Sequence, residues 1–472
     1  MFSKWMTKMI TITEKIKVAH ERLSKTNLKF LEFVEKNPWC LKHSYYENIK
    51  WPYRPLIFQP WPLYVNQYFK KEMMEAGKDV YNLIKQIPKK IFNFNAREIG
   101  RYYEVSQETI NHILSGITEE HIHHLLGRGD YIYSPEHGFK CMEYNISGNL
   151  GGWELPFWND MYRQTEPLTK FFNETSPELI NENLIDIALR LYINRIIQHF
   201  PNQRNDINTV MVMAGHPDGT INSPLEKYSF SLYQDILKSK NMGLQGELNV
   251  CDYKHLIVKG NYLYYKGKRV LCLHENYGGV VPEEIYHVSR IGELILYVGP
   301  LTFLMSNKLN IALLSEHEES NLFSPKERQT IKKYIPWSRK TLPGQTRYQG
   351  ETINLETFIL TNREKLVLKP ALSYGGKDIL IGIYTSPQEW GNSVQTAFHK
   401  KTWLVQEYIE PSSYLFQEGK EGCGEHDIVW GIFVFGGTYA GSFLRTLSKT
   451  DNKGLINAKQ GADVSVVFEV RE

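Results

Sequence analysis

The chain has 472 residues, too many for one compact core, and this length predicts about two to four domains. Hydrophobic residues make up 42% of the chain and aromatic residues 13%, which is enough to fill several cores and excludes extensive disorder. The 55 Lys and Arg residues nearly balance the 52 Asp and Glu residues, so charge gives no indication of a nucleic-acid or membrane partner.

The N-terminal segment and the cysteines predict a cytoplasmic protein. Lys8 and Glu14 interrupt the N-terminus before the apolar stretch of a signal peptide forms. The longest apolar run, Ile428 to Phe435, is far shorter than a membrane-spanning helix. The 5 cysteines are scattered and never in CxxC spacing, which favours reduced thiols.

Apolar residues at helical spacing dominate the N-terminal quarter of the chain. They predict helical structure from about Thr11 to Lys36 and a mixed helical region from Val65 to Leu126. Helix starts are expected near Ser106 and Thr118, where a capping residue precedes the apolar pattern. We assign no chemistry to this part of the chain.

From Asp130 to Ile146 the apolar period changes to two, which predicts a β-hairpin around a short loop near Glu136. Residues two apart on a strand share a face, so Glu143 and Asn145 should project together. The residues between and beside them should pack on the opposite, apolar face: Met142, Tyr144 and Ile146.

This hairpin has the residue types of a magnesium site. Asp130 should fall opposite Met142 or Glu143, and Arg128 should fall near Asn145 or the residue before it. Three oxygen ligands, from Asp130, Glu143 and Asn145, would then lie beside one fixed positive charge. Mg²⁺ favours such oxygen sites and completes its shell with water and phosphates. The alternative is a surface hairpin with ordinary polar residues.

A β-α-β pattern and a hairpin follow, and they predict a parallel sheet in the middle of the chain. The helices are expected at Asp186–Phe200 and Lys227–Lys240, and the strands at Asn208–Ala214, Leu248–Cys251, Tyr262–Tyr265 and Arg269–Leu273. Past these, the basic and proline-containing segment Thr330–Tyr348 reads as a crossing between domains.

Strands and helices alternate from there to the C-terminus. The strands are expected at Lys365–Lys369, Ile379–Ile383, Trp403–Ile409, Ile428–Phe435 and Thr438–Leu444, with a helix at Pro387–Phe398. Gly436-Gly437 has the composition of a two-residue hairpin turn between the last two strands.

Lys369 ends one of these strands and leads into a glycine loop. Gly375 and Gly376 allow the loop to bring backbone N–H groups close to an anion. Because Asp378 follows Lys377, the metal-binding Ser or Thr of a P-loop is absent. A cation followed by such a loop suits phosphate, while a purely structural lysine is the alternative.

The strand Trp403–Ile409 has the composition of an adenine-binding hinge. A strand edge offers a backbone N–H and C=O to the base, with Glu407 accepting from the exocyclic amine. Arg445 ends the last strong strand, near Asp427 across the hairpin. A solvated salt bridge between these two and a triphosphate contact by Arg445 both remain open.

Taken together, these residues resemble the circularly permuted ATP-grasp proteins, in particular the synthetase domain of glutathionylspermidine synthase. The resemblance covers roughly Arg128 to the C-terminus, with the metal motif before the lysine and glycine loop, as in the permuted group. The matching segments are Arg128-Gly129-Asp130, Glu143-Tyr144-Asn145, Ser306-Asn307-Lys308, Lys369-Pro370 through Gly376, Gln406-Glu407 and Arg445. The stretch Ile146–Glu154 and Tyr374 depart from the family pattern, so its named substrates are not carried over.

The resemblance implies an α/β (α+β) protein with a circularly permuted ATP-grasp fold. It also implies a pre-ATP-grasp-like β-α-β subdomain and a helical N-terminal region. The expected parts are a mainly helical region 1–126, a metal-binding part of the core 127–200, the β-α-β subdomain 201–325 and a nucleotide-binding part 326–472.

The activity implied is that of an ADP-forming carboxylate–amine ligase that uses Mg²⁺ and ATP and proceeds through an acyl phosphate. Asp130, Glu143 and Asn145 would bind the metal, and Arg128 and Arg445 would be catalytic. The nucleotide would be bound by Lys369, Ser373, Gly375, Gly376, Gln406, Glu407, Tyr408 and Ile409. The partners expected are a small-molecule or peptide carboxylate and an amine, with the oligomeric state left open.

Two alternatives remain: a kinase or carboxylate–thiol ligase on the same fold, and an inactive nucleotide-binding partner protein. His216, Trp153 and Glu154 are possible substrate contacts whose roles the sequence leaves open. The cluster from His121 to His124 reads as a polar helix surface rather than a metal site.

Overall fold

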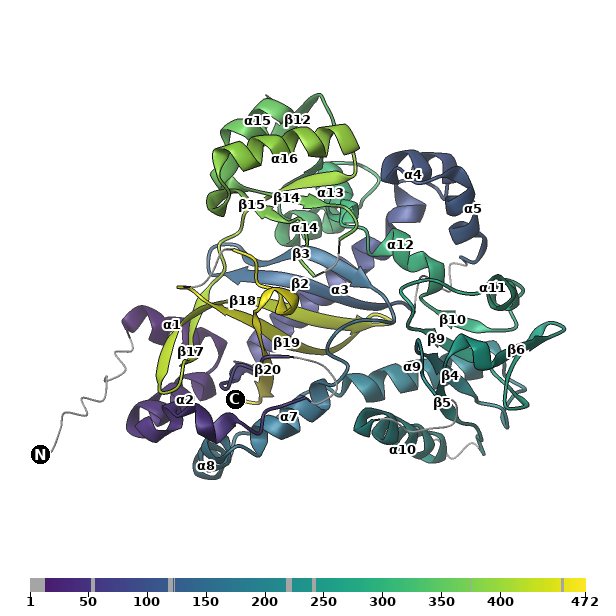
Figure 1. Ribbon diagram of the computed structural model, residues 1–472, viewed down its shortest axis with the longest axis horizontal. Coiled ribbons are helices and arrows are strands. Elements are labelled where there is room, and N and C mark those ends of the chain that lie inside the picture. The colour runs from purple at the N-terminus through teal and green to yellow at the C-terminus, as the bar shows by residue number, and fades with distance from the viewer. Residues whose placement is uncertain are drawn as a thin grey trace, which may run out of the picture.

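The computed structural model describes residues 13–51, 56–117, 122, 124–217, 223–239, 243–373, 375–450 and 454–472. These residues form a mixed α/β fold with a central seven-stranded sheet and two four-stranded sheets, each with helices packed against it (Figure 1). The predicted α+β class is confirmed at this level.

The central sheet has the order β1-β20-β19-β18-β2-β3, with β17 paired to β18. Its neighbours are antiparallel except β1 and β20, which run parallel. The N-terminal region therefore supplies a strand that its helical pattern does not predict. The strands are β1 (Leu63–Asn66), β2 (Leu126–Ser134), β3 (Gly138–Ile146), β17 (Ser413–Glu418), β18 (Gly422–Phe435), β19 (Thr438–Ser448) and β20 (Asp463–Val470).

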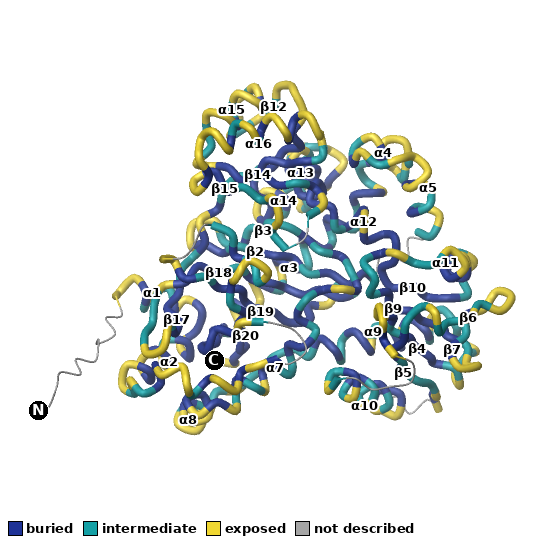
Figure 2. The backbone as a smooth tube through the Cα atoms, viewed as in Figure 1, coloured by how far each residue is buried: buried dark blue, intermediate teal, exposed yellow. Residues whose placement is uncertain are grey.

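Helix α3 (Gln67–Lys90) packs on the central sheet and contacts β18, β2 and β3. At Gly77 the helix comes very close to the sheet, since a Cβ there would lie 2.8 Å from Cγ2 of Ile432. Figure 2 shows the resulting buried centre of the molecule. The apolar residues that α3 buries recur at helical spacing: Met73, Ala76, Val80, Ile84 and Ile87.

The helical structure predicted from about Thr11 to Lys36 is confirmed for the described residues, where two helices, α1 (Glu14–Leu23) and α2 (Lys25–Lys36), meet at Ser24. The Ser24 hydroxyl accepts a hydrogen bond from the Asn27 N–H and donates one to the Tyr64 carbonyl of β1, both at 2.8 Å. Ser24 thus caps α2 and ties it to β1, and its extended backbone ends α1.

Shorter helices complete the central part of the molecule. The predicted helix start at Ser106 is confirmed, since its hydroxyl accepts from the Thr109 N–H at 3.2 Å. The other predicted start, Thr118, lies outside the described residues, and the helix expected from Asp186 is α9. These helices are α4 (Ala96–Tyr103), α5 (Gln107–Ser115), α7 (Leu155–Arg163), α8 (Glu166–Thr175) and α9 (Leu184–His199).

A second, antiparallel sheet, the upper sheet, has the order β11-β16-β14-β15 and lies above β2 and β3 in Figure 1. The strands predicted at Lys365–Lys369 and Trp403–Ile409 and the helix before β16 are confirmed, whereas the strand predicted at Ile379–Ile383 is reduced to two residues because a 3-10 helix begins at Gly382. The elements are β11 (Ser338–Lys340), β14 (Leu366–Pro370), β15 (Leu380–Ile381), β16 (Trp403–Glu407), the hairpin β12 (Gln345–Tyr348) and β13 (Glu351–Asn354), and the helices α15 (Leu355–Thr361) and α16 (Pro387–Lys400).

The predicted crossing, Thr330–Tyr348, contains regular structure. It holds the end of α14 (Pro325–Tyr334), then β11 and β12. Helix α14 contacts α3 and β3, whereas β11 pairs with β16, so the chain does pass from the central to the upper sheet here. Before α14, α12 (Thr302–Met305) and α13 (Leu309–Glu316) lead from the third sheet toward this junction.

The third sheet is parallel, with the order β10-β9-β4-β5, and lies at the right of Figure 1. The predicted β-α-β unit is confirmed, since β4 and β5 run parallel and α10 lies between them in the chain. The elements are β4 (Thr209–Val212), α10 (Pro224–Ser239), β5 (Leu248–Cys251), β9 (Cys272–Glu275), α11 (Glu283–Arg290) and β10 (Ile295–Tyr297).

The hairpin predicted from Tyr262 to Leu273 is only partly right. A small sheet of β6 (Leu256–Lys259), β7 (Tyr262–Tyr265) and β8 (Lys268–Arg269) contains its turn. The second arm ends after two residues because the chain then leaves the hairpin and continues into β9 of the parallel sheet.

All five cysteines lie among the described residues and carry free thiols. No helix in the described ranges has both the length and the apolar composition that crossing a membrane requires.

Candidate functional site

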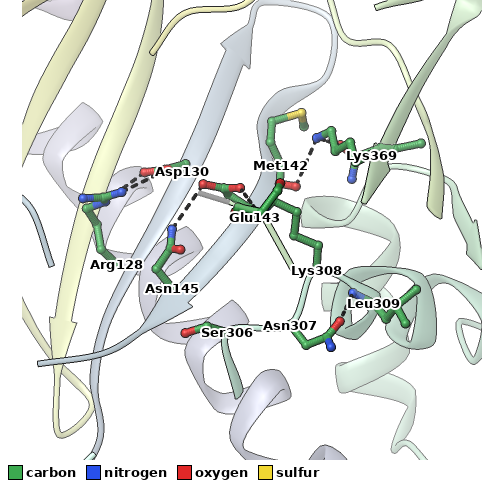
Figure 3. Close-up of polar contacts among 12 residues, drawn as sticks. Arg128, Asp130, Met142, Glu143, Asn145, Ser306, Asn307, Lys308, Leu309 and Lys369 are labelled. Atoms are coloured by element: carbon green, nitrogen blue, oxygen red, sulfur yellow. Dashed lines mark hydrogen bonds and ion pairs between the residues drawn. The ribbon is translucent and has the colours of Figure 1, made fainter. Parts of the chain in front are cut away.

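Strands β2 and β3 bring the predicted metal-site residues together. Asp130 lies opposite Glu143 and Arg128 lies opposite Asn145, so the predicted register is confirmed. The amide of Asn145 donates to Oε1 of Glu143 at 3.3 Å, which shows that both side chains project on one face. Figure 3 shows this group beside Lys369.

The orientation predicted for Met142 is wrong. A bulge in the β2–β3 register leaves Met142 without a partner, because Asp130 pairs with Glu143 and the next residue, Tyr131, pairs with Cys141. The extra residue breaks the alternation of the strand. Met142 therefore lines the same cleft as Glu143, while Cys141 and Tyr144 are buried on the other side.

Asp130 is held by two guanidinium groups. Arg128 binds it through two bonds, Nε to Oδ1 at 3.0 Å and Nη2 to Oδ2 at 3.2 Å. Arg445 approaches from β19, with Nη2 at 2.8 Å from Oδ1. Only 4% of the Asp130 side chain is exposed, so this is a buried charge cluster.

The salt bridge between Arg445 and Asp427, one of the two possibilities left open by the sequence, is not among the ion pairs of the described residues. The β18–β19 register places Arg445 opposite Val429 and Asp427 opposite Leu447. Arg445 instead reaches across β18 to Asp130 on β2. Its Nε is buried and has no hydrogen-bond partner among the described residues, which leaves a donor for a ligand.

Lys308 is the site residue that sequence reasoning missed. Its Nζ lies 3.2 Å from Oε2 of Glu143 and donates to the Ser373 carbonyl of the glycine loop at 2.7 Å. Burial alone would raise the pKa of the Glu143 carboxyl, but Lys308 above all, with Lys369 and Arg445, holds it well below its usual range. The available signal was the Ser306-Asn307-Lys308 segment, which matched the family without a role attached.

Lys369 extends from β14 toward the central sheet. Its Nζ donates to Oε1 of Gln406 at 2.5 Å and to the Met142 carbonyl at 3.4 Å. Burial lowers the pKa of its ammonium to about 8, and the Glu143 carboxylate opposes that shift. Segments more than two hundred residues apart in sequence thus meet at this point.

The cleft between the two sheets contains about 680 Å³ of open space. Along β2 its lining changes from Asp130 to Ile132, and along β14 from Lys369 to Val367, so one end is charged and the other apolar. Each pair is two residues apart and shares a strand face. The other lining residues are Met142, Glu143, Gly376, Ile379, Ile381, Tyr408, Ile409, Val429, Arg445, Gly454, Leu455, Ile456 and Asn457.

The glycine loop closes the upper side of the cleft. Gly375 and Gly376 have φ of 70° and 76°, a region that favours glycine. The Ser373 hydroxyl is buried and has no partner among the described residues. Tyr374, the departure from the family pattern, lies outside the described residues.

The sequence predicts that the segment Trp403–Ile409 offers a free strand edge to an adenine base, and the structure shows a different arrangement. Strand β16 is not an edge, because it pairs with β11 and β14. The backbone N–H groups of Glu407 and Tyr408 donate to the chain itself, each at 2.8 Å. The Glu407 carboxylate accepts from the Tyr348 hydroxyl at 3.3 Å and does not line the cleft. Tyr408 and Ile409 do line it, while Gln406 lies behind Lys369.

The charges of the site do not balance. Two carboxylates, Asp130 and Glu143, are surrounded by more cations than they can neutralise. Side-chain exposure is only 13% for Arg128 and 8% for Arg445. Charges buried in excess are costly without a counter-charge. The surrounding cations are Arg128, Lys308, Lys369 and Arg445.

The oxygen ligands fit magnesium that arrives with a phosphate. Within the described parts of the chain, no cluster of three or more His, Cys, Asp or Glu residues is placed to hold a metal ion. Mg²⁺ is commonly bound through one or two carboxylates, with substrate phosphates and water completing its shell. Asp130, Glu143 and the adjacent Asn145 amide provide that set.

The other candidate contacts lie away from this cluster. His216 is buried after β4, with its Nε2 3.4 Å from Glu226. Trp153 stacks on Phe435 at 5.2 Å between ring centroids and donates to the Gly148 carbonyl. Neither lines the cleft, nor does Glu154, which is buried. His121 and His123 of the histidine cluster lie outside the described residues.

Glu275, at the end of β9, is a buried carboxyl outside the cleft, where it accepts from the N–H groups of Tyr277 and Gly279. Burial raises its pKa from 4.5 to about 7. The folded protein therefore holds this proton more tightly than the unfolded chain does. The free energy of unfolding should fall as pH rises from about 4.5 to about 7, and Glu275→Gln should remove that part of the slope. Urea denaturation across this range measures it, with the exposed Glu283→Gln as control; equal slopes would contradict the assignment.

No protein-family model matches the sequence, and a search of curated proteins finds no significant similarity. The residues of the cleft and their geometry are therefore the basis for assigning a function.

Proposed function

We propose that this protein is an ATP-dependent, ADP-forming carboxylate–amine ligase with a circularly permuted ATP-grasp fold. The observation that carries the proposal is that one end of the cleft is apolar and the other end is charged. One end has aliphatic walls from both sheets, including Ile132, Val429 and Ile381. At the other end the lining cations are Lys369 and Arg445, and two further cations, Lys308 and Arg128, hold the lining carboxylates from behind. A nucleoside triphosphate also differs between its two ends, with a flat base at one end and negatively charged phosphates at the other.

The cationic end would take the phosphates. Lys369 and Lys308 approach from the upper side of the cleft and Arg445 from the central sheet. The unpartnered Nε–H of Arg445, a residue that lines the cleft, is a donor that an anion would satisfy. Ser373, the other predicted contact with an unpartnered donor, does not line the cleft. A magnesium triphosphate carries net negative charge, so it would offset the excess positive charge.

Asp130, Glu143 and Asn145 would hold magnesium. Bound there, a magnesium ion would neutralise negative charge on the phosphates. In this structure each carboxylate is held by a cation, Asp130 by the two arginines and Glu143 by Lys308. Lys308 and Arg445 are the groups that would turn to phosphate, while Arg128 stays on Asp130, so metal and nucleotide would bind together.

A ligase must make a carboxylate electrophilic before an amine attacks it. Phosphoryl transfer from ATP to the substrate carboxylate gives an acyl phosphate, and the amine then displaces phosphate. Both steps place negative charge on oxygen atoms, so positioned cations supply most of the stabilisation. Arg128, fixed by Asp130 and the Gly151 carbonyl, is the rigid cation at the metal end.

Product analysis tests this proposal. Purified protein with Mg-ATP is screened for ADP release against panels of carboxylates and amines, with mass detection of products. A ligase yields an amide together with ADP and phosphate. A stable phosphorylated product would identify a kinase, and a product formed only with thiols would identify a thiol ligase. Nucleotide binding without turnover of any pair would favour an inactive partner protein.

Arg128→Ala should retain nucleotide binding but reduce turnover roughly 100-fold or more, because it removes a charge that acts during phosphoryl transfer. Calorimetry gives the nucleotide affinity and ADP release gives the rate. Arg190→Ala, at a side chain 47% exposed on α9, is the matched control. Near-normal turnover in Arg128→Ala would remove Arg128 from the mechanism.

A further inference from the structure

Gln406 lies directly behind Lys369. The two residues sit on the paired strands β16 and β14 of the upper sheet, where Gln406 faces Val367 in the register. Gln406 is completely buried and is not part of the cleft lining. Its Oε1 accepts from Nζ of Lys369 at 2.5 Å, so its side chain is linked to the charged end of the cleft through the lysine.

The orientation of the Gln406 amide is set by Ser338 on the other neighbouring strand, β11. The Ser338 hydroxyl donates to the Pro336 carbonyl at 3.0 Å. It therefore acts as the acceptor for Nε2 of Gln406, which lies at 3.1 Å. Because the amide nitrogen is committed to Ser338, the amide oxygen must face Lys369.

The ammonium of Lys369 is thereby held with a defined direction. A lysine ammonium has three N–H donors. Gln406 takes one and the Met142 carbonyl, at 3.4 Å, takes another. The described residues provide no third hydrogen-bond acceptor for this ammonium, so the remaining donor is available to the cleft. A neutral amide holds the ammonium without cancelling its charge, which a carboxylate in the same place would do.

We propose that Gln406 is a positioning residue that aims the Lys369 ammonium at the phosphate end of the cleft, and not a contact of the nucleotide base. The inference rests on the proposed function, since it takes a polyphosphate as the ligand. Its consequence is selective: losing Gln406 should weaken binding of the phosphates and leave binding of the base unchanged.

Calorimetric titration with ATP and with adenosine measures the two parts separately. Gln406→Met keeps the volume but removes the acceptor, and it should weaken ATP binding roughly tenfold with adenosine affinity unchanged. Gln406→Glu should weaken ATP binding further, because its carboxylate competes with phosphate for the ammonium. Ser338→Ala, which frees the amide to rotate, should give a smaller loss of the same kind and carries the test if Gln406→Met does not fold.

A double-mutant cycle with Lys369→Met is the decisive comparison. If Gln406 acts through Lys369, adding Gln406→Met to Lys369→Met should have no further effect on ATP affinity. Gln417→Met is the matched control, because Gln417 is also buried and its amide donates to the Leu41 and Gly419 carbonyls far from the cleft. It should leave both affinities unchanged.

Two results would overturn the inference. An equal loss of ATP and adenosine affinity in Gln406→Met would make Gln406 a base contact or a general stabilising residue. A full additional loss in the Lys369→Met background would show that it acts independently of the lysine. Failure of the wild-type protein to bind ATP would instead refute the proposed function.

Discussion

Lys369→Met is expected to weaken ATP binding about 100-fold while leaving adenosine affinity unchanged. Lys369 is buried at the charged end of the cleft. Two of its three N–H groups donate to the Met142 carbonyl and to Gln406, and the third could donate to a ligand. Methionine keeps most of the volume but removes the charge. The apolar end, where Val367 and Ile381 pair on adjacent strands, stays intact. Calorimetry with both ligands at neutral pH measures the difference.

The matched control is Lys365→Met, at an exposed lysine just before the same strand. It removes an equal charge outside the cleft and should leave ATP affinity within about twofold of wild type, since exposed charges interact weakly. Equal losses in both variants would mean that ATP affinity depends on net charge alone, which would contradict the placement of the phosphates in the cleft.

Glu143→Gln should remove the effect of magnesium on nucleotide binding and reduce turnover roughly 100-fold or more. Glu143 is the central carboxylate of the site, in contact with Asn145 and Lys308 and opposite Asp130. The amide keeps the shape but cannot supply the charge that a hard cation requires. ATP affinity is compared with and without EDTA in the wild type and the variant.

Wild-type protein should bind ATP more tightly with magnesium than in EDTA, because the metal would replace Lys308 at Glu143 and Arg445 at Asp130. Glu136→Gln, in the turn of the same hairpin and 84% exposed, should behave as wild type. A variant Glu143→Gln that still responds to magnesium would place the metal elsewhere.

The early hairpin shows what local sequence determines. Alternation with a period of two and a turn near Glu136 place Asp130 opposite Met142 or Glu143, and this much follows from sequence alone. The bulge at Met142, which places Glu143 opposite Asp130, does not follow from sequence. One extra residue in the strand changes the direction of a side chain without changing the composition of the strand.

The partners of Arg445 and Gln406 depend on which strands become neighbours, and local patterns do not specify that. Arg445 meets Asp130 because β2 joins the far side of β18. Gln406 is interior because β11, from a segment that reads as a crossing, pairs with β16. Lys308 enters the site because α13 begins beside the glycine loop. Each is a long-range contact that appears only once the sheets are assembled.

The central claim is that the cleft between the central and upper sheets binds a magnesium nucleotide. A crystal structure of the protein with Mg-ADP tests it most directly. We expect the phosphates beside Lys369, Lys308 and Arg445, magnesium on Glu143, and the base between the strands that carry Ile381 and Val429. Nucleotide bound at any other place, or an empty cleft at saturating Mg-ADP, would contradict the account.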